Sequence, residues 1–235
     1  AKNLGYRVNL GIECEIFLIK YENGRVIPAN ATDILPKAAY DVIGLLENFD
    51  WLKEVVSCMN TLGWEVHSFD HEDANSQFEF DFAYADIMKT ADRFILWRLM
   101  MKEISRRHGF EATFMPKPYN DRTGSGAHFN ISFESIETGE NLFGDADDER
   151  GCGLSALAYQ CIAGILEHAP AIVATTCPTV NSYKRLVKTG SMTGYTWAPI
   201  FISYGANNRT HMLRVPNIRP QIEGTAESHS KINLS

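Results

Sequence analysis

Residues 6–20 read YRVNLGIECEIFLIK and contain the clearest strand pattern near the start of the chain. Apolar residues at positions 12, 14 and 16 alternate there with the carboxylates of Glu13 and Glu15. A period of two residues is typical of a β-strand, in which successive side chains point to opposite faces. The stretch therefore predicts a sheet strand with both carboxylates on one face.

Two later stretches repeat this pattern and add polar side chains to one face of a strand. The polar residues are Gln77, Glu79 and Asp81 in QFEFDFAY (residues 77–84) and His128, Asn130 and Ser132 in AHFNISF (residues 127–133). The residues between them are mostly phenylalanine and isoleucine, which suit the buried face of a sheet. Three strands are therefore predicted to present polar, acid-rich faces.

Acid-rich faces that converge in this way suit a pair of divalent metal ions. Side chains at positions i and i+2 lie roughly 7 Å apart on one face of a strand. Carboxylates this close repel one another unless a cation lies between them. A ligand set of oxygens with one imidazole favours Mg²⁺ or Mn²⁺ over zinc. An antiparallel sheet with one solvated face explains any single strand equally well.

The other elements follow from helical periods and turn formers. Helices are predicted at residues 38–47, 52–62, 85–108, 154–168 and 169–176, and strands at 64–69, 111–115, 199–204 and 210–215. From Asn217 onward the chain is polar and free of aromatic residues, which predicts a frayed tail. The pattern as a whole predicts an α+β architecture, with an antiparallel-leaning sheet and helices on one side.

Composition excludes several classes of protein. The chain has 235 residues, 45% of them hydrophobic and 22% charged, which is enough for one large domain or two small ones. A net charge of −7 argues against a nucleic-acid partner, because such surfaces attract phosphates. The longest apolar stretches carry Arg98 or are cut by Pro170 and Pro178, so no membrane span of about 18 residues is expected.

The cysteines bear on the compartment. They are five in number, which is odd, and none is spaced as C-x-x-C, so neither a disulfide framework nor a zinc knuckle is expected. The sequence therefore predicts a reducing, cytoplasmic setting.

Four long segments, in this order, resemble the catalytic domain of the glutamine synthetase family. They are HEDANSQFEFDFAYAD (71–86), ATFMPKPYNDRTGSGAHFNIS (112–132), PTVNSYKRL (178–186) and SYGANNRTHMLRVP (203–216). The resemblance runs from about Leu4 to Glu223 and implies a curved, largely antiparallel sheet with helices packed behind it. It implies a catalytic domain over residues 1–216, followed by a diverged or disordered tail at 217–235.

The resemblance implies ATP-dependent ligation of an amine to glutamate. In the family, the γ-carboxylate of L-glutamate attacks the γ-phosphate of ATP, and a small amine then displaces phosphate from the acyl phosphate. The flap GYTWAP (194–199) is similar to that of glutamate–methylamine ligases, so methylamine is the expected amine and ammonia the alternative. Relatives that use ammonia carry a flap glutamate where this chain has Trp197.

The resemblance also implies roles for individual residues. Glu15, Glu72 and Glu79 would hold one metal ion, and Glu13, His128 and Glu223 a second, in a site of two to three ions. Arg185 and Gly124 match positions that bind the substrate glutamate, Arg209 and Arg214 match arginines that stabilise the transferred phosphoryl group, and Asn130 and Ser132 match positions near the nucleotide.

Members of the family form homo-oligomeric rings whose shared active sites are closed by a small β-grasp domain of a neighbouring subunit. That domain is absent upstream of Ala1, so the 235 residues alone are expected to be at best a feeble ligase. Beyond Val215 the resemblance decays, and an expected arginine is replaced by Thr225. A truncated, non-catalytic homologue that binds nucleotide and metal is therefore the rival hypothesis.

Overall fold

The computed structural model describes residues 1–187, 198–216 and 232–234. Its centre is a 10-stranded sheet built around one strand of 17 residues, β1 (Tyr6–Glu22). The main path across the sheet is β3 (Val66–His71), β4 (Gln77–Phe82), β1, β7 (Ala127–Ser135), β10 (Ile232–Leu234), β9 (Leu213–Val215) and β8 (Tyr204–Ala206). Three short strands also pair with β1, namely β2 (Arg25–Pro28), β5 (Ala85–Asp86) and β6 (Glu111–Thr113).

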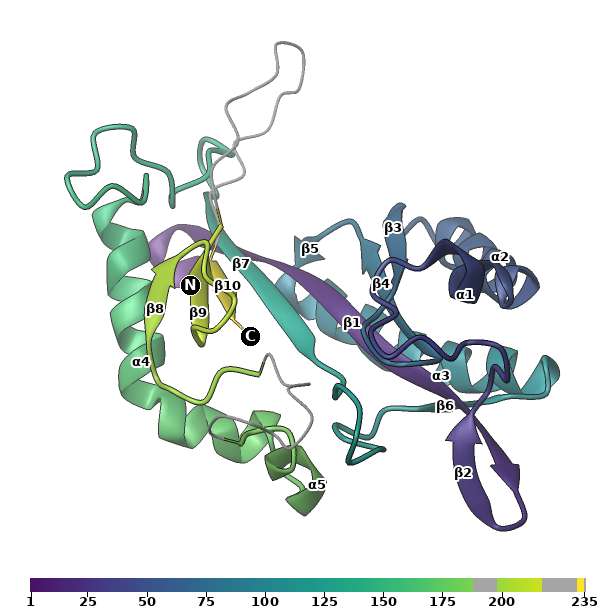
Figure 1. Cartoon of the computed structure of the whole chain (residues 1–235). Helices are drawn as coiled ribbons and strands as arrows, with labels where there is room; N and C mark the ends of the chain where they lie inside the picture. The colour runs from purple at the N-terminus through teal and green to yellow at the C-terminus, as the bar shows by residue number, and fades with distance from the viewer. Residues whose placement is uncertain (188–197, 217–231, 235) are drawn as a thin grey trace.

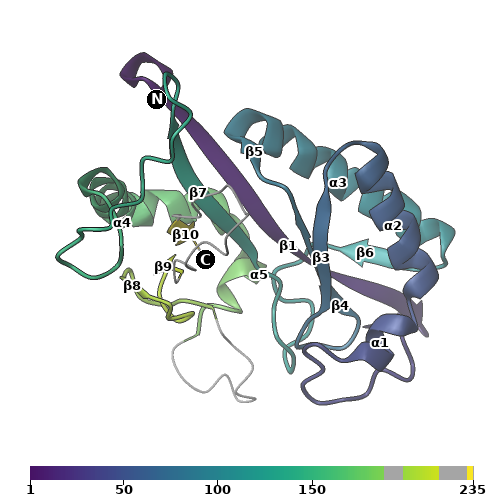
Figure 2. The ribbon, with the colours of Figure 1, turned by 90° about the horizontal axis from the view of Figure 1, so that it is seen from above.

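The described strand pairs are antiparallel except for β8 and β9, which run parallel. The described helices are the 3-10 turn η1 (Lys2–Leu4), α1 (Val42–Leu46), α2 (Phe49–Thr61), α3 (Ile87–Arg107), α4 (Ala156–Thr176) and α5 (Val180–Tyr183). Figures 1 and 2 show α2 and α3 together at the end of the sheet that holds β3 and β4, while α4 lies at the other end.

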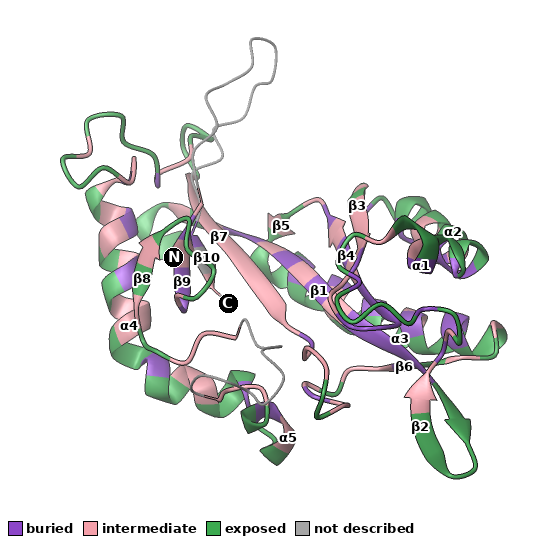
Figure 3. Ribbon diagram, viewed as in Figure 1, coloured by how far each residue is buried: buried purple, intermediate pink, exposed green. Residues whose placement is uncertain are grey.

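The first hydrophobic core lies between one face of the sheet and α2 and α3. The even-numbered residues of β1 and β4 supply its sheet side, including Ile16 and Phe80, and both are fully buried. The indole rings of Trp51 on α2 and Trp97 on α3 contact Phe80, with ring centroids 5.7 and 6.2 Å apart. These helices therefore cover the apolar face that the alternation predicts (Figure 3).

A second core joins the other end of the sheet to α4. It contains Leu154, Ala158 and Ile162 near the start of the helix, packed against strand residues that include Leu213 and Ile232. Phe133 of β7 packs against this core and Phe129 against the first, so both cores lie on the same face of β7. The opposite face of β1, β4 and β7 carries polar side chains, except at Phe17 and Ile19 of β1, which form a third, small core with Ala74.

The structure confirms the α+β fold but corrects several boundaries. The helix predicted from residue 38 begins at Val42, because Tyr40 has a positive φ of 63° and the Asp41 side chain caps the helix by accepting a hydrogen bond from the Gly44 N–H. The strand predicted at 64–69 begins two residues later, after Glu65 turns the chain with a φ of 53°. The strand predicted at 199–204 is wrong; β8 begins only at Tyr204, where β9 offers a partner.

Two predictions about the last third of the chain are also wrong. The helices predicted at 154–168 and 169–176 form one helix, α4, which runs through Pro170. Proline costs the helix one hydrogen bond, and the fully buried Ala169 next to it shows that tertiary packing holds this turn. The tail is not frayed at Ile232–Leu234, because these residues form β10 between β7 and β9.

Helix α4 alone among the described helices is long and apolar enough to cross a membrane, with a hydropathy of 1.3 over its best window and 22% of that window buried. The sequence prediction excluded such a span because it placed a break at Pro170. Length and composition alone do not establish a membrane span, because helices in the core of a protein can be equally long and apolar. Ala158 and Ile162 belong to the second core, so α4 packs against the sheet through these side chains.

Strand β10 is expected to be a large contributor to stability, because Ile232 is fully buried in the second core. Replacing a buried isoleucine by alanine typically costs about 2 to 5 kcal/mol. We expect Ile232→Ala to lower the free energy of unfolding, measured by urea denaturation, by an amount in this range. The matched control is Ile34→Ala, since Ile34 is 78% exposed. Equal stability of the two variants would contradict the position of β10.

Candidate active site

The strand register lines up polar side chains in two rows across the open face of the sheet. In one row, Glu15 of β1 lies opposite Glu79 of β4, which lies opposite Asp70 of β3. In the other row, Glu13 lies between Asp81 of β4 and His128 of β7. Residues directly opposite in antiparallel strands have Cβ atoms about 4.5–5.5 Å apart, so the register itself forces the carboxylates together.

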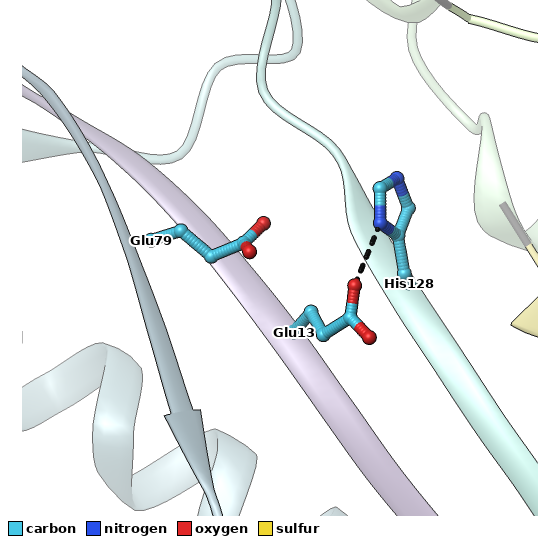
Figure 4. A group of neighbouring side chains, drawn as sticks. All are labelled: Glu13, Glu79 and His128. Carbon is cyan, nitrogen blue, oxygen red and sulfur yellow. Dashed lines mark hydrogen bonds and ion pairs between the residues drawn. The ribbon is translucent and has the colours of Figure 1, made fainter. Parts of the chain in front are cut away.

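Glu13, Glu79 and His128 form the first group of side chains that could hold a metal ion. One ligand atom from each residue lies within 4.8 Å of the others. Figure 4 shows these side chains pointing toward one another from β1, β4 and β7. The Nδ1 atom of His128 is 3.1 Å from Oε2 of Glu13, so imidazole and carboxylate already form a hydrogen bond.

Glu15, Glu72 and Glu79 form the second group, again with ligand atoms within 4.8 Å of one another. This is the set that the resemblance assigns to one metal ion. Glu79 belongs to both groups, whereas the resemblance places it in the Glu15 set only. The carboxylate of Glu79 therefore lies between the two candidate ion positions.

The pKa values of these carboxyl groups are raised by burial first and then by the charges of their neighbours. Burial, followed by the charges of Glu15 and Glu72, raises the pKa of Glu79 from 4.5 to about 10. Burial and the charge of Glu15 raise the pKa of Glu72 to about 7. Burial also raises the pKa of Glu15, although His128, the Gly126 N–H and Arg185 oppose the shift. Carboxyl groups of this kind suit a divalent cation, which would remove the repulsion.

The pKa of His128 is also raised, although burial acts on it in the opposite direction. Burial disfavours its protonated form, but the hydrogen bond to Glu13 and the charges of Glu15 and Glu13 outweigh burial and raise its pKa. A proton on His128 therefore partly neutralises the carboxylates around it. A metal ion would replace that proton, because imidazole binds metals in its neutral form.

Glu72 comes from a loop, and a buried ion pair holds the start of that loop. Nε2 of His71 lies 2.8 Å from Oδ2 of Asp33, and both side chains are fully buried. Nδ1 of His71 lies 2.8 Å from the carbonyl oxygen of Glu72. Both ring nitrogens face oxygen acceptors, so the ring satisfies both only as the imidazolium. The same carboxylate accepts a hydrogen bond from the Ser76 N–H, which fixes the far end of the loop.

Asp70, Glu79 and Asp81 form a third acidic group that the sequence prediction did not assign to a metal site. Asp81 was recognised on the polar face of its strand, but Asp70 was missed because the predicted strand ended at Phe69. Ser68, Asp70 and Glu72 continue the same two-residue alternation, and that period could have revealed Asp70.

Arg185 and Gly124 lie next to the Glu15 end of the site. A guanidinium nitrogen of Arg185 donates a hydrogen bond to the carbonyl of Ser125, and its charge acts on Glu15. A side chain at Gly124 would have its Cβ only 2.4 Å from the Pro116 carbonyl oxygen, so glycine is required there. The structure thus brings together two of the residues matched to glutamate binding.

Arg214 lies at the His128 end. Strand β10 separates β9 from β7, so Arg214 lies two strands away from Asn130. Burial and the charge of Arg209 lower the pKa of Arg214, while Glu13 and Glu79 raise it. These interactions place Arg214 within electrostatic reach of the carboxylates. Arg209 lies in the exposed turn that precedes β9.

The other predicted residues are placed as follows. The Asn130 side-chain amide donates a hydrogen bond of 2.7 Å to Oε1 of Glu13, so it contacts a candidate metal ligand directly. Ser132 is on the same face of β7, two residues further from the carboxylates, opposite Asn9 of β1. Trp197 and Glu223 lie outside the described residues.

Comparisons with known proteins show the family of the chain. The family model described as "Glutamine synthetase, catalytic domain" matches residues 1–229. A glutamine synthetase of Rhizobium leguminosarum bv. phaseoli is 43% identical over 216 residues, which are 92% of this chain and 49% of the relative. A glutamate–methylamine ligase of Methyloversatilis universalis is 41% identical over 218 residues, which are 93% of this chain and 49% of the relative.

A solved structure described as a GmaS/ADP complex superposes with a TM-score of 0.87 at 40% identity, covering 100% of this chain and 50% of the other. The fold is therefore that of a glutamine synthetase catalytic domain, with acidic strands facing an open site. The chain belongs to the glutamine synthetase family. It spans about half the length of the curated relatives it matches.

The raised pKa values predict that, without divalent ions, stability falls as pH rises. Glu72 and Glu79 keep protons in the folded chain at pH values where an unfolded glutamate, with a pKa of 4.5, has lost them. The stability linked to these protons is complete below pH 4.5 and is lost as pH rises through about 7 for Glu72 and about 10 for Glu79.

Urea denaturation in EDTA at pH 5.5, 7 and 9 is expected to show this decline. Glu79→Gln is expected to flatten the profile between pH 7 and 9, because the neutral amide removes the group that keeps a proton in the folded chain and has lost it in the unfolded chain. Glu137→Gln, at an exposed position, is the control and should keep the parent profile. A parent whose stability is constant from pH 5.5 to 9 would contradict the electrostatics of the site.

A divalent ion is expected to stabilise the folded chain. Mn²⁺ at about one hundred times its Kd should raise the free energy of unfolding by about 2.7 kcal/mol, and EDTA should reverse the effect. Glu15→Gln and Glu79→Gln are each expected to lower Mn²⁺ affinity at least about tenfold by calorimetry, while the fold is retained. Unchanged Mn²⁺ binding in both variants would remove these residues from the ligand set.

Proposed function

We propose that this chain is the catalytic part of an ATP-dependent glutamate–amine ligase, which forms a γ-glutamyl amide through γ-glutamyl phosphate. The observation that carries the proposal is the convergence of Glu13, Glu15, Glu72, Glu79 and His128 on one open sheet face, within reach of Arg214 and Arg185. An anionic carboxylate that attacks a polyphosphate needs its charge neutralised, and metal ions with arginines supply that neutralisation.

In this proposal the two described groups of ligands would hold Mg²⁺ or Mn²⁺, with Glu223 completing the group that contains Glu13 and His128. The ions would neutralise the phosphates of ATP and polarise the transferred phosphoryl group. Within the chain, Arg214 and Arg209 would stabilise the charge on that group, while Asn130 and Ser132 would lie beside the nucleotide.

At the other end of the open face, Arg185 would bind a carboxylate of L-glutamate beside the Gly124 backbone. The two substrates would thus meet across the carboxylate rows. This arrangement agrees with the hydrogen bond from Arg185 to Ser125 and with the proximity of its charge to Glu15.

Methylamine is the amine we propose, with ammonia as the alternative, since relatives of both kinds match at similar identity. The sequence at Trp197 favours methylamine, because an aromatic ring can contact a methyl group and attract a methylammonium ion through its π face. We further propose a cytoplasmic homo-oligomer, in which a neighbouring subunit helps to close each site.

The test is amide formation with the upstream domain supplied. Phosphate release should require ATP, Mg²⁺ or Mn²⁺, L-glutamate and methylamine together, and mass spectrometry should detect the γ-glutamyl amide. Arg214→Gln should lower kcat without abolishing Mn²⁺ binding, because its side chain acts on phosphate. Metal and nucleotide binding without amide formation would instead favour the non-catalytic homologue.

The identity of the residue at position 197 is expected to determine amine preference. A methyl contact in an apolar pocket is worth about 1 to 3 kcal/mol, so kcat/KM should favour methylamine over ammonia roughly ten- to two-hundredfold. Trp197→Glu should shift that ratio toward ammonia, measured by phosphate release with each amine. A ratio that stays the same while both rates fall would give Trp197 a structural role only.

A further inference from the structure

Gln77 is a fully buried polar residue at the end of the open face, next to Glu15. It belongs to neither group of candidate metal ligands. Its side-chain nitrogen donates a hydrogen bond of 2.9 Å to Oε2 of Glu15 and another of 3.1 Å to the carbonyl of Gly124. Its side-chain oxygen accepts a hydrogen bond of 3.2 Å from the Ala74 N–H. One amide therefore contacts a candidate metal ligand, the loop that carries Glu72, and the loop at residues 124–126, which we call the substrate loop.

The surroundings fix which way this amide points. Glu15 and Gly124 offer only acceptor oxygens, while Ala74 offers a donor, so only one orientation satisfies all three partners. Oε2 of Glu15 also accepts a hydrogen bond of 2.8 Å from the Gly126 N–H. Two donors on one oxygen restrict rotation of the Glu15 carboxylate.

The loop at residues 124–126 is attached to β1 at its last residue, where the Gly126 carbonyl accepts a hydrogen bond of 3.3 Å from the Glu15 backbone N–H. Its further contacts are the Gln77 amide on Gly124, the Pro116 carbonyl and Arg185 on Ser125, and the Glu15 side chain on Gly126. A displacement of Glu15 on ion binding would therefore be transmitted to Gly124 through Gln77.

We propose that Gln77 is a positioning residue whose amide holds the Glu15 carboxylate and the Gly124 carbonyl together, so that divalent-ion binding and the placement of the substrate loop are coupled. The inference rests on the proposed function, because it takes Glu15 as a metal ligand and the 124–126 loop as part of the glutamate site.

The first experiment measures Mn²⁺ affinity of the 235-residue chain by calorimetry. Gln77→Met keeps the length of the side chain and removes its three hydrogen bonds. Loss of a residue that orients a metal ligand typically costs 10- to 100-fold in affinity, and that is the expected loss here. Gln160→Met, on the exposed side of α4, is the matched control and should bind as the parent does.

The second experiment follows the parent chain by NMR during a Mg²⁺ titration, and does not depend on a variant that folds. The chain has three glutamines, Gln77, Gln160 and Gln221, so a sample ¹⁵N-labelled at glutamine gives three side-chain amide signals, and a second sample labelled at serine reports the Ser125 backbone amide. The Gln77 signal and the Ser125 backbone amide are expected to shift with one midpoint, while the Gln160 signal stays still. In a folded Gln77→Met variant, the Ser125 shift at saturating Mg²⁺ should fall to less than half.

The outcomes separate the two hypotheses. A parent that does not bind Mn²⁺ would overturn the metal site and the role of Gln77 with it. A folded Gln77→Met variant with parental Mn²⁺ affinity, or a Gln77 signal that does not move when Mg²⁺ saturates the parent, would overturn the role of Gln77 and leave the proposed function standing.

Discussion

The antiparallel pairing of β1 with β4 fixes both the first hydrophobic core and the acidic face of the sheet. It places Glu15 opposite Glu79 and Glu13 opposite Asp81. The apolar residues between them are locked in the first core, and a slip of one residue would exchange the two faces. Burial of the hydrophobic face therefore forces like charges together on the other face, at a separation they would otherwise avoid.

The chain compensates for this repulsion without removing it. His128 and Arg214 bring positive charge to one end of the carboxylate rows, and Arg185 brings it to the other. The pKa of Glu79 still rises to about 10, so the ion-free fold keeps a proton at neutral pH. Repulsion between neighbouring carboxylates is expected at functional sites. The rest of the fold is stable enough to hold these groups together, and a bound cation would remove the repulsion.

Buried polar residues hold the irregular parts of the site. Asp33 and His71 anchor the loop that carries Glu72, and Gln77 joins that loop to Glu15 and Gly124. These loops lie at the end of the open face, where the rings of Phe17 and Tyr119 make an edge-to-face contact. A polar network with its hydrogen bonds made can fix loop geometry as firmly as a strand ladder does.

The faces of β1, β4 and β7 could be predicted from the sequence, because a two-residue period is a local property of the chain, and Glu13, Glu15, Glu79 and His128 were therefore expected on open faces. Four ordered motifs also indicated the family. The folded chain was needed to show that Glu79 belongs to both ligand groups, that Asp70 joins it, and that β10 places Arg214 near His128. Strand β10 has three residues and no readable period, so its pairing depends on partners more than 90 positions away along the chain, Phe129 to Ile131. Long-range register of this kind is set by packing of the whole sheet, and no local pattern encodes it.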